Sequence, residues 1–206
     1  MEDVIIIGAG LSGLSTAYNL KKENISFKIL EAQNRLGGRI ETIYGNQNTP
    51  MEMGATWFGI EHKNLIQFLS EINVDYFEQH NEGIALFDTM SFEPPQQYFV
   101  PANSHSAYRI KGGTYSIIEA LHQHIGKENI VLNAEVIEVF DEGDTIKIKD
   151  ILKNTFFCKH LIISIPPKLL TNTIAFSPIL PKAIRQVMQK TPVSYTHLTL
   201  PTKRIV

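Results

Sequence analysis

Cysteine is nearly absent from this sequence. Cys158 is the only one among 206 residues, so no internal disulfide can form. This scarcity is typical of the reducing cytosol, and we expect a cytoplasmic location with Cys158 buried and inert. No basic region precedes the apolar run Val4 to Ile7, and glycines follow it at once, which is unlike a secretory signal peptide. No apolar stretch approaches the ~20 residues that span a bilayer, so we expect no membrane association.

An excess of charge is also absent. The chain has 19 Lys and Arg against 21 Asp and Glu, a formal net charge of −2, which favours neither nucleic acid nor an anionic membrane as a partner. His122 and His124, two positions apart, fall on different faces of an expected helix, so we predict no metal site. The 43% hydrophobic fraction is that of a globular protein with one domain or a tight pair.

The N-terminal residues have the pattern of a strand, a turn, a helix and a second strand. Val4 to Ile7 is a β-branched run typical of a parallel strand that is buried on both faces. Apolar residues recur at helical spacing from Leu11 to Leu20, and Phe27 to Leu30 is the second strand. This order predicts a βαβ unit at the start of the chain.

Three glycines mark the junction between the first strand and the helix. In the pattern G-x-G-x-x-G, Gly8 allows the tight turn, Gly10 lets a pyrophosphate approach the backbone, and Gly13 permits close packing of helix on strand. Glu31 ends the second strand, where a carboxylate can accept both ribose hydroxyls of an adenosine. We therefore predict a dinucleotide site; the alternative is a glycine-rich turn without a ligand. The residues expected at this site are Gly8, Gly10, Leu11, Ser12, Gly13, Glu31, Ala32 and Arg35.

The segment "EAQNRLGGRIET" adds two more glycines and an arginine. Gly37 and Gly38 allow a second close backbone approach, and Arg39 can neutralise part of a pyrophosphate charge. Taken alone, Arg39 is also consistent with a surface residue after a Gly-Gly turn. Together with the first glycine motif, Gly38 and Arg39 become candidate cofactor-binding residues.

The remaining sequence predicts a mixture of helices and short strands. Ser116 and Glu119 fit a capping box at the start of a helix that Gly126 ends. The expected elements are a helix in 60–72, an irregular connection over 74–105, a helix in 112–126, short strands in 134–141, 145–150 and 154–160, a separate buried strand in 161–167, and a helix with Pro181 in its first turn.

The string "VIIIGAGLSGLSTAYNL…KILEAQNRLGGRI" resembles the flavin amine oxidase superfamily, which includes monoamine, polyamine and L-amino-acid oxidases. The likeness runs from about residue 3 to about residue 192. It implies an α/β fold: a Rossmann-like FAD-binding domain with a βαβ start and a β-meander insertion, part of a substrate or cap domain, and a truncated end. The implied domain segments are 1–60 and 106–167 for FAD, 61–105 for the cap, and 168–192 for the start of the substrate domain.

The resemblance also implies further cofactor contacts. "MEMGATWFG" is similar to a family segment whose backbone amides approach the flavin, which makes Gly54, Ala55, Thr56 and Trp57 candidates. The backbone at Val136 matches a position that contacts the adenine. From the residues alone, Trp57 and Phe58 are equally consistent with core aromatics, and Val136 with the core of any strand.

The activity that the resemblance implies is FAD-dependent oxidation of a small amine. The amine becomes an imine and then an aldehyde or keto acid, while O2 is reduced to H2O2. One alternative is another FAD-dependent oxidoreductase of this fold, such as a carotenoid desaturase or a protoporphyrinogen oxidase. The other is a non-catalytic, truncated nucleotide-binding module. No catalytic residue is assigned, and the oligomeric state, the amine, and the choice between oxidase and dehydrogenase stay open.

The end of the chain has a pattern of its own. "VSYTHLTLPT" is the translation of a transposon-end adapter used in preparing DNA for sequencing, and the family resemblance stops just before it. We therefore expect residues 193–206 not to be native, the natural chain to continue past Pro192, and the fragment itself to be inactive.

Overall fold

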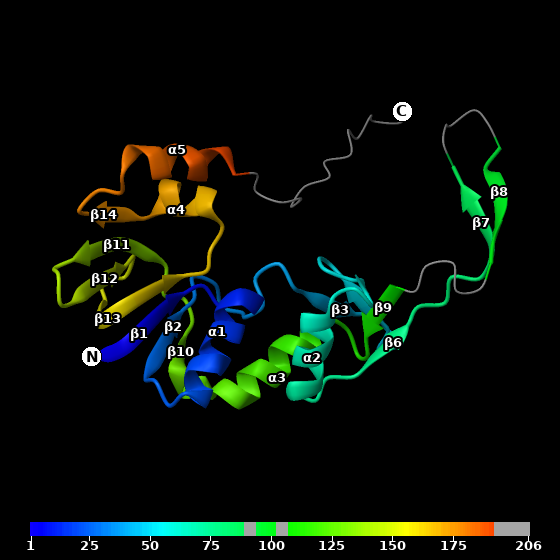
Figure 1. The fold of residues 1–206 in the computed structure, drawn as a ribbon, viewed down its shortest axis with the longest axis horizontal. Coiled ribbons are helices and arrows are strands. Elements are labelled where there is room, and N and C mark those ends of the chain that lie inside the picture. The colour runs from blue at the N-terminus through cyan, green and yellow to red at the C-terminus, as the bar shows by residue number, and fades with distance from the viewer. Residues whose placement is uncertain (89–93, 102–106, 192–206) are drawn as a thin grey trace. The chain divides into compact units, whose positions relative to one another are not determined.

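The computed structural model describes residues 1–88, 94–101 and 107–191, so the predicted adapter segment lies outside the described residues. The chain forms two compact units: Met1–Leu36 with the chain from Ile125 onward, and Gly37–His124 (Figure 1). We call these the first and the second unit. The division follows packing, whereas the predicted domain segments follow function, so those segments stay predictions.

The first unit is built on one mixed sheet. Its strand order is β10-β2-β1-β13-β12-β11-β14, in which β10, β2, β1 and β13 are parallel, β12 is antiparallel to both of its neighbours, and β14 is parallel to β11 (Figure 1). The helix α1 connects β1 to β2 as the βαβ pattern predicts. The α/β fold class with its β-meander is therefore confirmed. The bounds are β1 Glu2–Ile7, α1 Leu11–Lys22, β2 Phe27–Leu30, η1 Lys127–Asn129, β10 Ile130–Val131, β11 Val136–Asp141, β12 Ile146–Asp150, β13 Thr155–Ile163, α4 Pro167–Thr173, β14 Ala175–Ser177 and α5 Lys182–Lys190.

The core of this unit surrounds β1. Ile5 and Ile6 point to opposite faces of the sheet and are 1% and 0% exposed, as expected for a central parallel strand. Burying each such side chain stabilises the fold by about 1.5–3 kcal/mol. Cys158 on β13 is also fully buried, and this burial raises the pKa of its thiol, in keeping with an inert residue.

Two predicted strands turn out to be one. The sequence predicted separate strands in 154–160 and 161–167, but β13 runs without a break from Thr155 to Ile163. Lys159 and His160, at the expected boundary, are exposed positions within the strand. The expectation of a fully buried second strand is also wrong, because Leu161 to Ile163 are only half-buried. One strand therefore pairs with β12 from Thr155 to Cys158 and with β1 from Cys158 to Ile163.

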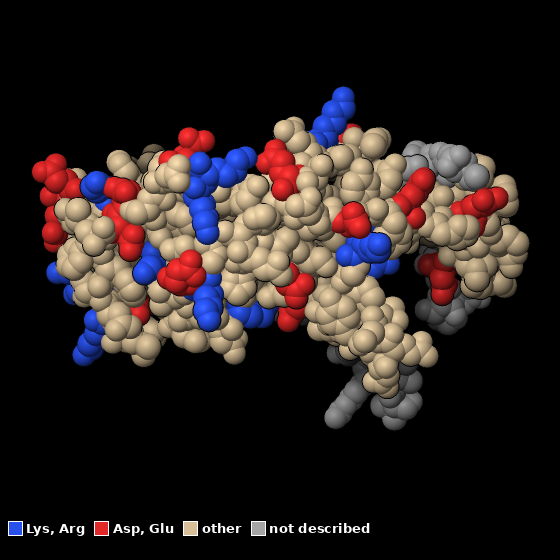
Figure 2. Space-filling view, turned by 90° about the horizontal axis from the view of Figure 1, so that it is seen from below, with Lys and Arg blue, Asp and Glu red and all other residues tan. Residues whose placement is uncertain are grey.

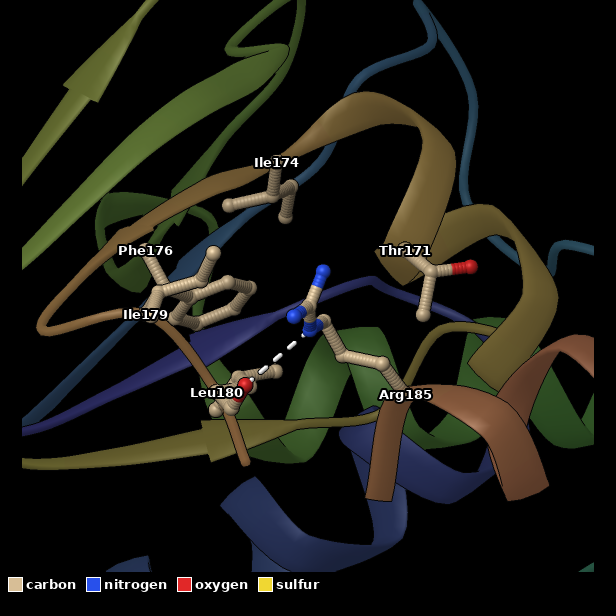
Figure 3. A pocket seen from close by; sticks show the side chains of 6 residues that line it. All are labelled: Thr171, Ile174, Phe176, Ile179, Leu180 and Arg185. Carbon is tan, nitrogen blue, oxygen red and sulfur yellow. Dashed lines mark hydrogen bonds between the residues drawn. The ribbon is translucent and has the colours of Figure 1, made fainter. Parts of the chain in front are cut away.

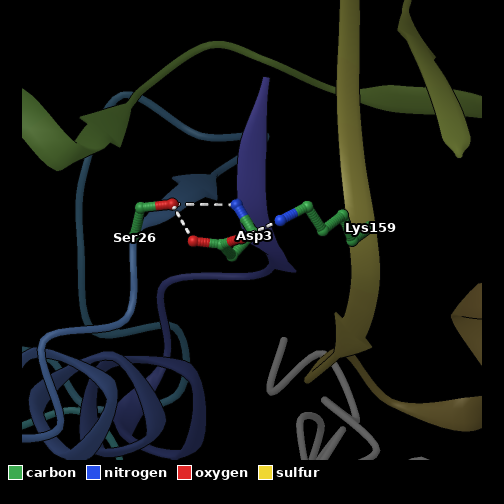
Figure 4. Close-up of polar contacts among 3 residues, drawn as sticks. All are labelled: Asp3, Ser26 and Lys159. Carbon is green, nitrogen blue, oxygen red and sulfur yellow. Dashed lines mark hydrogen bonds and ion pairs between the residues drawn. The ribbon is translucent and has the colours of Figure 1, made fainter.

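A polar contact at the start of β1 joins this strand to β13 and to the residue that precedes β2 (Figure 4). The Asp3 carboxylate accepts hydrogen bonds from Lys159 Nζ at 2.7 Å and from Ser26 Oγ at 2.7 Å. The Asp3 N–H in turn donates to Ser26 Oγ at 2.9 Å. These partners, led by the Lys159 hydrogen bond, hold the pKa of Asp3 below its ordinary value.

The described residues of the second unit form smaller sheets and two helices. An aromatic cluster of Phe58, Tyr76 and Tyr108 joins the three strands of its largest sheet, order β5-β9-β6, with ring centroids 5.3 to 5.7 Å apart. In the described part of 74–105, where an irregular connection was expected, the structure has three short strands. The bounds are β3 Thr42–Tyr44, β4 Pro50–Glu52, β5 Phe58–Gly59, α2 Lys63–Glu71, β6 Tyr76–Glu78, β7 Gly83–Phe87, β8 Gln96–Val100, β9 Ala107–Ile110 and α3 Tyr115–Ile125.

The predicted capping box at the start of α3 is wrong. Ser116 lies inside the helix, and its hydroxyl donates to Lys111 O at 3.4 Å. The N-terminal amides are instead bonded to side chains that are distant in the sequence: Glu52 accepts from Thr114 N, and Thr42 accepts from Tyr115 N. Pro181, expected in the first turn of the last helix, is the residue that precedes α5.

None of the helices in the described part of the chain is long and apolar enough to cross a bilayer.

Candidate functional site

The turn between β1 and α1 brings the three glycines of the first motif together. Gly8 has φ 101°, a left-handed conformation that side chains disfavour. A Cβ at Gly13 would collide with the Gly8 carbonyl oxygen, so the helix packs on the turn only because that atom is missing. A Cβ at Gly10 would meet no protein atom within 4 Å. The space beside Gly10 is thus available to a ligand.

The same turn presents hydrogen-bond donors. In the described residues, no protein acceptor binds the backbone N–H groups of Leu11, Ser12 and Gly13, the first three residues of α1. Gly10 precedes the helix without a side-chain cap, and the first turn contains no acidic residue. Free amides and the positive end of the helix dipole together favour an anion such as a phosphate. The residues present therefore fit a pyrophosphate.

Glu31 connects this turn to the end of β2. The residue is 9% exposed, and its carboxylate accepts hydrogen bonds from Ala9 N at 2.6 Å and Gln33 N at 2.9 Å. A carboxylate has about four acceptor sites, so two amide bonds leave capacity for ribose hydroxyls. Ala32, directly after it, is exposed. The structure thus places Glu31 beside the glycine turn, and its role toward a ribose stays a prediction.

Two other predicted site residues of the first unit, Val136 and Arg35, have side chains that are buried or half-buried. Val136 is 5% exposed and belongs to the hydrophobic core between β11 and its neighbours. Only its backbone could serve the adenine, which is what the resemblance implied. Arg35 is half-buried, and its Nη1 donates to Leu36 O at 3.3 Å.

Sequence reasoning missed Ser164, which follows β13 directly. Its hydroxyl lies 2.9 Å from Gly8 O and 3.0 Å from Ile7 O, and its N–H donates to Ile7 O at 2.9 Å. Ser164 therefore holds the start of the glycine turn through its hydrogen bonds to Ile7 O and Gly8 O. The only signal in the sequence was a small polar residue after an apolar strand, and nothing local connects it with Gly8.

The candidate residues of the second unit gather around residues 54–57. A Cβ at Gly54 would collide with the Arg39 carbonyl oxygen, so the Gly-Gly-Arg segment and residues 54–57 lie against each other. Gly38 has φ 57°, and Gly38 and Arg39 are exposed. In the described part of the chain, the N–H groups of Gly54, Ala55 and Thr56 have no protein acceptor. This second set also offers backbone donors on an exposed surface.

Trp57 and Phe58 separate into two different roles. Trp57 is 66% exposed, so the alternative of a core aromatic is wrong for it, and its Nε1 donates to Gln79 Oε1 at 2.7 Å. Phe58 is 8% exposed and packs against Tyr76 and Tyr108, so it is the core aromatic of the pair.

A small cavity of the first unit involves none of the predicted site residues. It has a volume of about 140 Å³ and lies among α4, β14 and α5 (Figure 3); its lining residues are Thr171, Ile174, Phe176, Ile179, Leu180 and Arg185. Arg185 Nε donates to Leu180 O at 3.0 Å. Small-molecule pockets usually measure about 300–1,000 Å³. We therefore treat this cavity as a packing gap between short elements.

Charge and metal chemistry add no further site. On the face shown in Figure 2, acidic and basic side chains are mixed along the described surface rather than gathered by sign. No group of three or more His, Cys, Asp or Glu side chains in the described residues could hold a metal ion. The candidate donors are therefore the backbone amides of residues 11–13 and 54–56.

Comparison with known families shows to which family this chain belongs. The sequence model of the flavin-containing amine oxidoreductases matches residues 11–92 and 82–204, well over half of the chain. The chain belongs to the flavin-containing amine oxidoreductase family. This membership confirms the resemblance read from the motifs and FAD as the cofactor, and the glycine turn described above fits that cofactor.

Curated relatives of this amine oxidoreductase chain include both oxidases and a dehydrogenase. A Dictyostelium discoideum protein named "Probable flavin-containing monoamine oxidase A" is 23% identical over 94% of this chain and 63% of its own length. An L-amino acid dehydrogenase of Synechocystis sp. is 38% identical over 44% of this chain and 20% of its own length. The chain thus spans less than two thirds of these relatives.

Solved structures of amine oxidases have the same fold. A putrescine oxidase superposes with a TM-score of 0.79 at 20% identity, covering 91% of this chain and 63% of that protein. The cyclohexylamine oxidase of Brevibacterium oxydans superposes with a TM-score of 0.80 at 16% identity and the same coverage. At these identities the likeness concerns the fold alone.

Proposed function

We propose that the whole protein is an FAD-dependent amine oxidase and that this chain holds much of its FAD site. The observation that carries the proposal is the glycine turn before α1, with free amides, no acidic residue in the first helical turn and open space at Gly10. Family membership supports a flavin as the ligand. A bare nucleotide-binding module would share the turn but would show no response to amines.

The binding roles follow from the chemistry of each group. The amides of Leu11 and Ser12 would donate to the pyrophosphate, and the Arg39 guanidinium would offset its charge. The Glu31 carboxylate would accept from the ribose, and the backbone at Val136 would contact the adenine. On the flavin side, the amides of 54–57 would donate hydrogen bonds. The proposed cofactor-binding residues are Gly8, Gly10, Leu11, Ser12, Gly13, Glu31, Ala32, Arg35, Gly38, Arg39, Gly54, Ala55, Thr56, Trp57 and Val136.

When bound, FAD supplies the redox chemistry by accepting a hydride from the carbon next to the amine nitrogen. The residues of this chain bind and orient the cofactor, and we assign none of them to proton transfer. The substrate would be a small amine, by analogy with relatives named for monoamine, putrescine and cyclohexylamine oxidation. Oxidation by O2 and a cytoplasmic location belong to the same proposal.

The experiment is a titration of the purified chain with FAD, followed by gel filtration. We expect the visible absorbance of flavin to elute with the protein. For the amine test, the protein is expressed from the reading frame amplified from genomic DNA across the codon for Pro192. Anaerobic addition of a primary amine should bleach the flavin absorbance of that protein. Gly10→Ala is the matched variant, because its Cβ meets no protein atom yet would enter the pyrophosphate site.

Three outcomes separate the alternatives. Flavin that binds and is bleached by amines, with H2O2 formed in air, supports the proposal. Flavin that binds but does not respond to amines favours another FAD-dependent oxidoreductase or a non-catalytic module. Wild type and Gly10→Ala that bind equally weakly would contradict the assigned turn.

A further inference from the structure

A polar network within the second unit connects the start of α3 with residues 54–57. Thr114 is 7% exposed, and its hydroxyl donates to Ala55 O at 3.0 Å while its N–H donates to Glu52 Oε1 at 2.8 Å. Glu52 Oε2 accepts from the Thr42 hydroxyl at 2.9 Å, and Thr42 Oγ1 accepts from Tyr115 N at 3.0 Å. Both the hydroxyl and the N–H of Thr114 therefore have hydrogen-bond partners.

Gly113 makes this network possible. It has φ 100°, and a Cβ there would lie 2.6 Å from Thr42 Cγ2 and 3.1 Å from Glu52 Oε1. Only glycine lets the start of α3 approach the β3–β4 hairpin this closely. The network therefore depends on backbone geometry as well as on side-chain hydrogen bonds.

The hydrogen bond from Thr114 determines the orientation of one peptide group. In a trans peptide the C=O of one residue and the N–H of the next point in opposite directions. Because the Ala55 C=O points to the buried Thr114 hydroxyl, the Thr56 N–H points away from it. That N–H has no protein acceptor among the described residues.

Residues 54–57 have few other restraints of this kind. Met53 N donates to Glu41 O at 2.9 Å just before the segment, and Thr56 Oγ1 donates to Gly54 O at 3.1 Å within it. The segment belongs to no helix or strand. Without Thr114, the Ala55–Thr56 peptide would be free to rotate, and a rotating donor binds a ligand less tightly than a fixed one.

We propose that Thr114 is a positioning residue whose hydroxyl fixes the Ala55–Thr56 peptide and holds the Thr56 N–H in the orientation that donates to the bound flavin. This inference rests on the proposed function. Neither the glycine motif nor the likeness of "MEMGATWFG" to a flavin-contacting segment points to Thr114. It depends on a contact between residues that are 59 positions apart.

The test compares Thr114→Val, which keeps the shape and removes the hydroxyl, with Thr114→Ser, which keeps the hydroxyl. We expect Thr114→Val to raise the Kd for FAD about fivefold to tenfold, as one lost hydrogen bond would, and Thr114→Ser to stay within about twofold of wild type. The visible absorption band of bound flavin should shift in Thr114→Val alone. Thr114→Ala is the second variant if Thr114→Val does not fold.

A second readout needs no cofactor. Trp57 is the only tryptophan of the chain and lies in the segment that Thr114 restrains, so its fluorescence reports on this segment. In the FAD-free chain, Thr114→Val should lower the anisotropy of Trp57 and increase its quenching by acrylamide, and Thr114→Ser should not.

The outcomes distinguish the two proposals. If wild type binds FAD and Thr114→Val binds it equally tightly, the positioning role is overturned while the proposed function stands. If wild type does not bind FAD, the proposed function is overturned for this chain, and the role of Thr114 toward the flavin with it. Loss of affinity in both Thr114→Val and Thr114→Ser would overturn the role of the hydroxyl, because a purely structural defect would explain it.

Discussion

The glycine turn at residues 8–13 and the segment at residues 54–57 both present backbone donors, but they are built in different ways. The turn lies between a buried strand and a helix, and glycine geometry within a few residues shapes it. The 54–57 segment has no regular structure and is restrained by Thr114, Glu41 and Gln79 from elsewhere in the second unit. The geometry of the turn can thus be worked out from its own residues, whereas the 54–57 segment was named only through the family resemblance and the residues that hold it are not visible in the sequence.

The largest expected effect is at Gly13. Gly13→Ala places a Cβ against the Gly8 carbonyl oxygen, and because both are backbone groups in a packed unit, neither can move cheaply. We expect the free energy of unfolding to fall by about 3 kcal/mol. Urea denaturation measures it, with Gly10→Ala as the control that changes by less than about 0.5 kcal/mol. Equal losses in both variants would contradict the prediction, because a Cβ at Gly10 meets no protein atom whereas one at Gly13 meets the Gly8 carbonyl oxygen.

The second prediction concerns Glu31. Glu31→Gln keeps the shape but removes the charge from an acceptor of two backbone amides, and one amide nitrogen replaces a carboxylate oxygen. Losing charge-assisted hydrogen bonds should cost about 2 kcal/mol, divided between folding and FAD affinity. Chemical denaturation with and without FAD separates the two shares. An unchanged FAD affinity would remove Glu31 from the ribose site and leave it a structural residue of the turn.

A smaller effect is expected at Gly54. Gly54→Ala also produces a collision, with the Arg39 carbonyl oxygen, but Gly54 and Arg39 are exposed and outside regular structure. The segment can shift, so we expect a loss of only about 1 kcal/mol in unfolding free energy. The shift should appear as a changed emission of Trp57 in the FAD-free chain. A loss as large as that of Gly13→Ala would show that the 54–57 segment is as rigid as the glycine turn, which would contradict the difference proposed between them.

The smallest effect is at Asp3. The Lys159 and Ser26 partners depress the pKa of Asp3 in the folded chain, so this group stabilises the fold above its unfolded value of 3.8, and the stabilisation is lost as the pH falls through the folded pKa. Asp3→Asn should lower the thermal midpoint slightly at pH 7, and less in high salt. Below the folded pKa the two proteins should melt alike. A difference that persists at such low pH would mean that charge is not the cause.

The βαβ unit could be predicted because its signals are local. The run Val4 to Ile7, the glycines at 8, 10 and 13, and the strand Phe27 to Leu30 lie within one short stretch, and the structure has β1, α1 and β2 there. The predictions that failed depended on partners distant in the sequence. The capping box at Ser116 was wrong because Glu52 and Thr42 bond to the amides at the start of α3, and β13 was divided because its pairing with β1 is not visible in its own sequence.

The sequence by itself predicted the βαβ unit with its glycine turn, because glycine spacing and β-branched runs restrict the backbone wherever they occur, and the resemblance of its motifs predicted the family and FAD. Only the tertiary structure decided that Ser164 supports the glycine turn, that Trp57 is exposed while Phe58 is buried, and that Thr114 holds Ala55. Each of these depends on a hydrogen bond or packing contact between segments far apart in the chain. Such contacts form only when the whole fold brings their partners to within bonding distance.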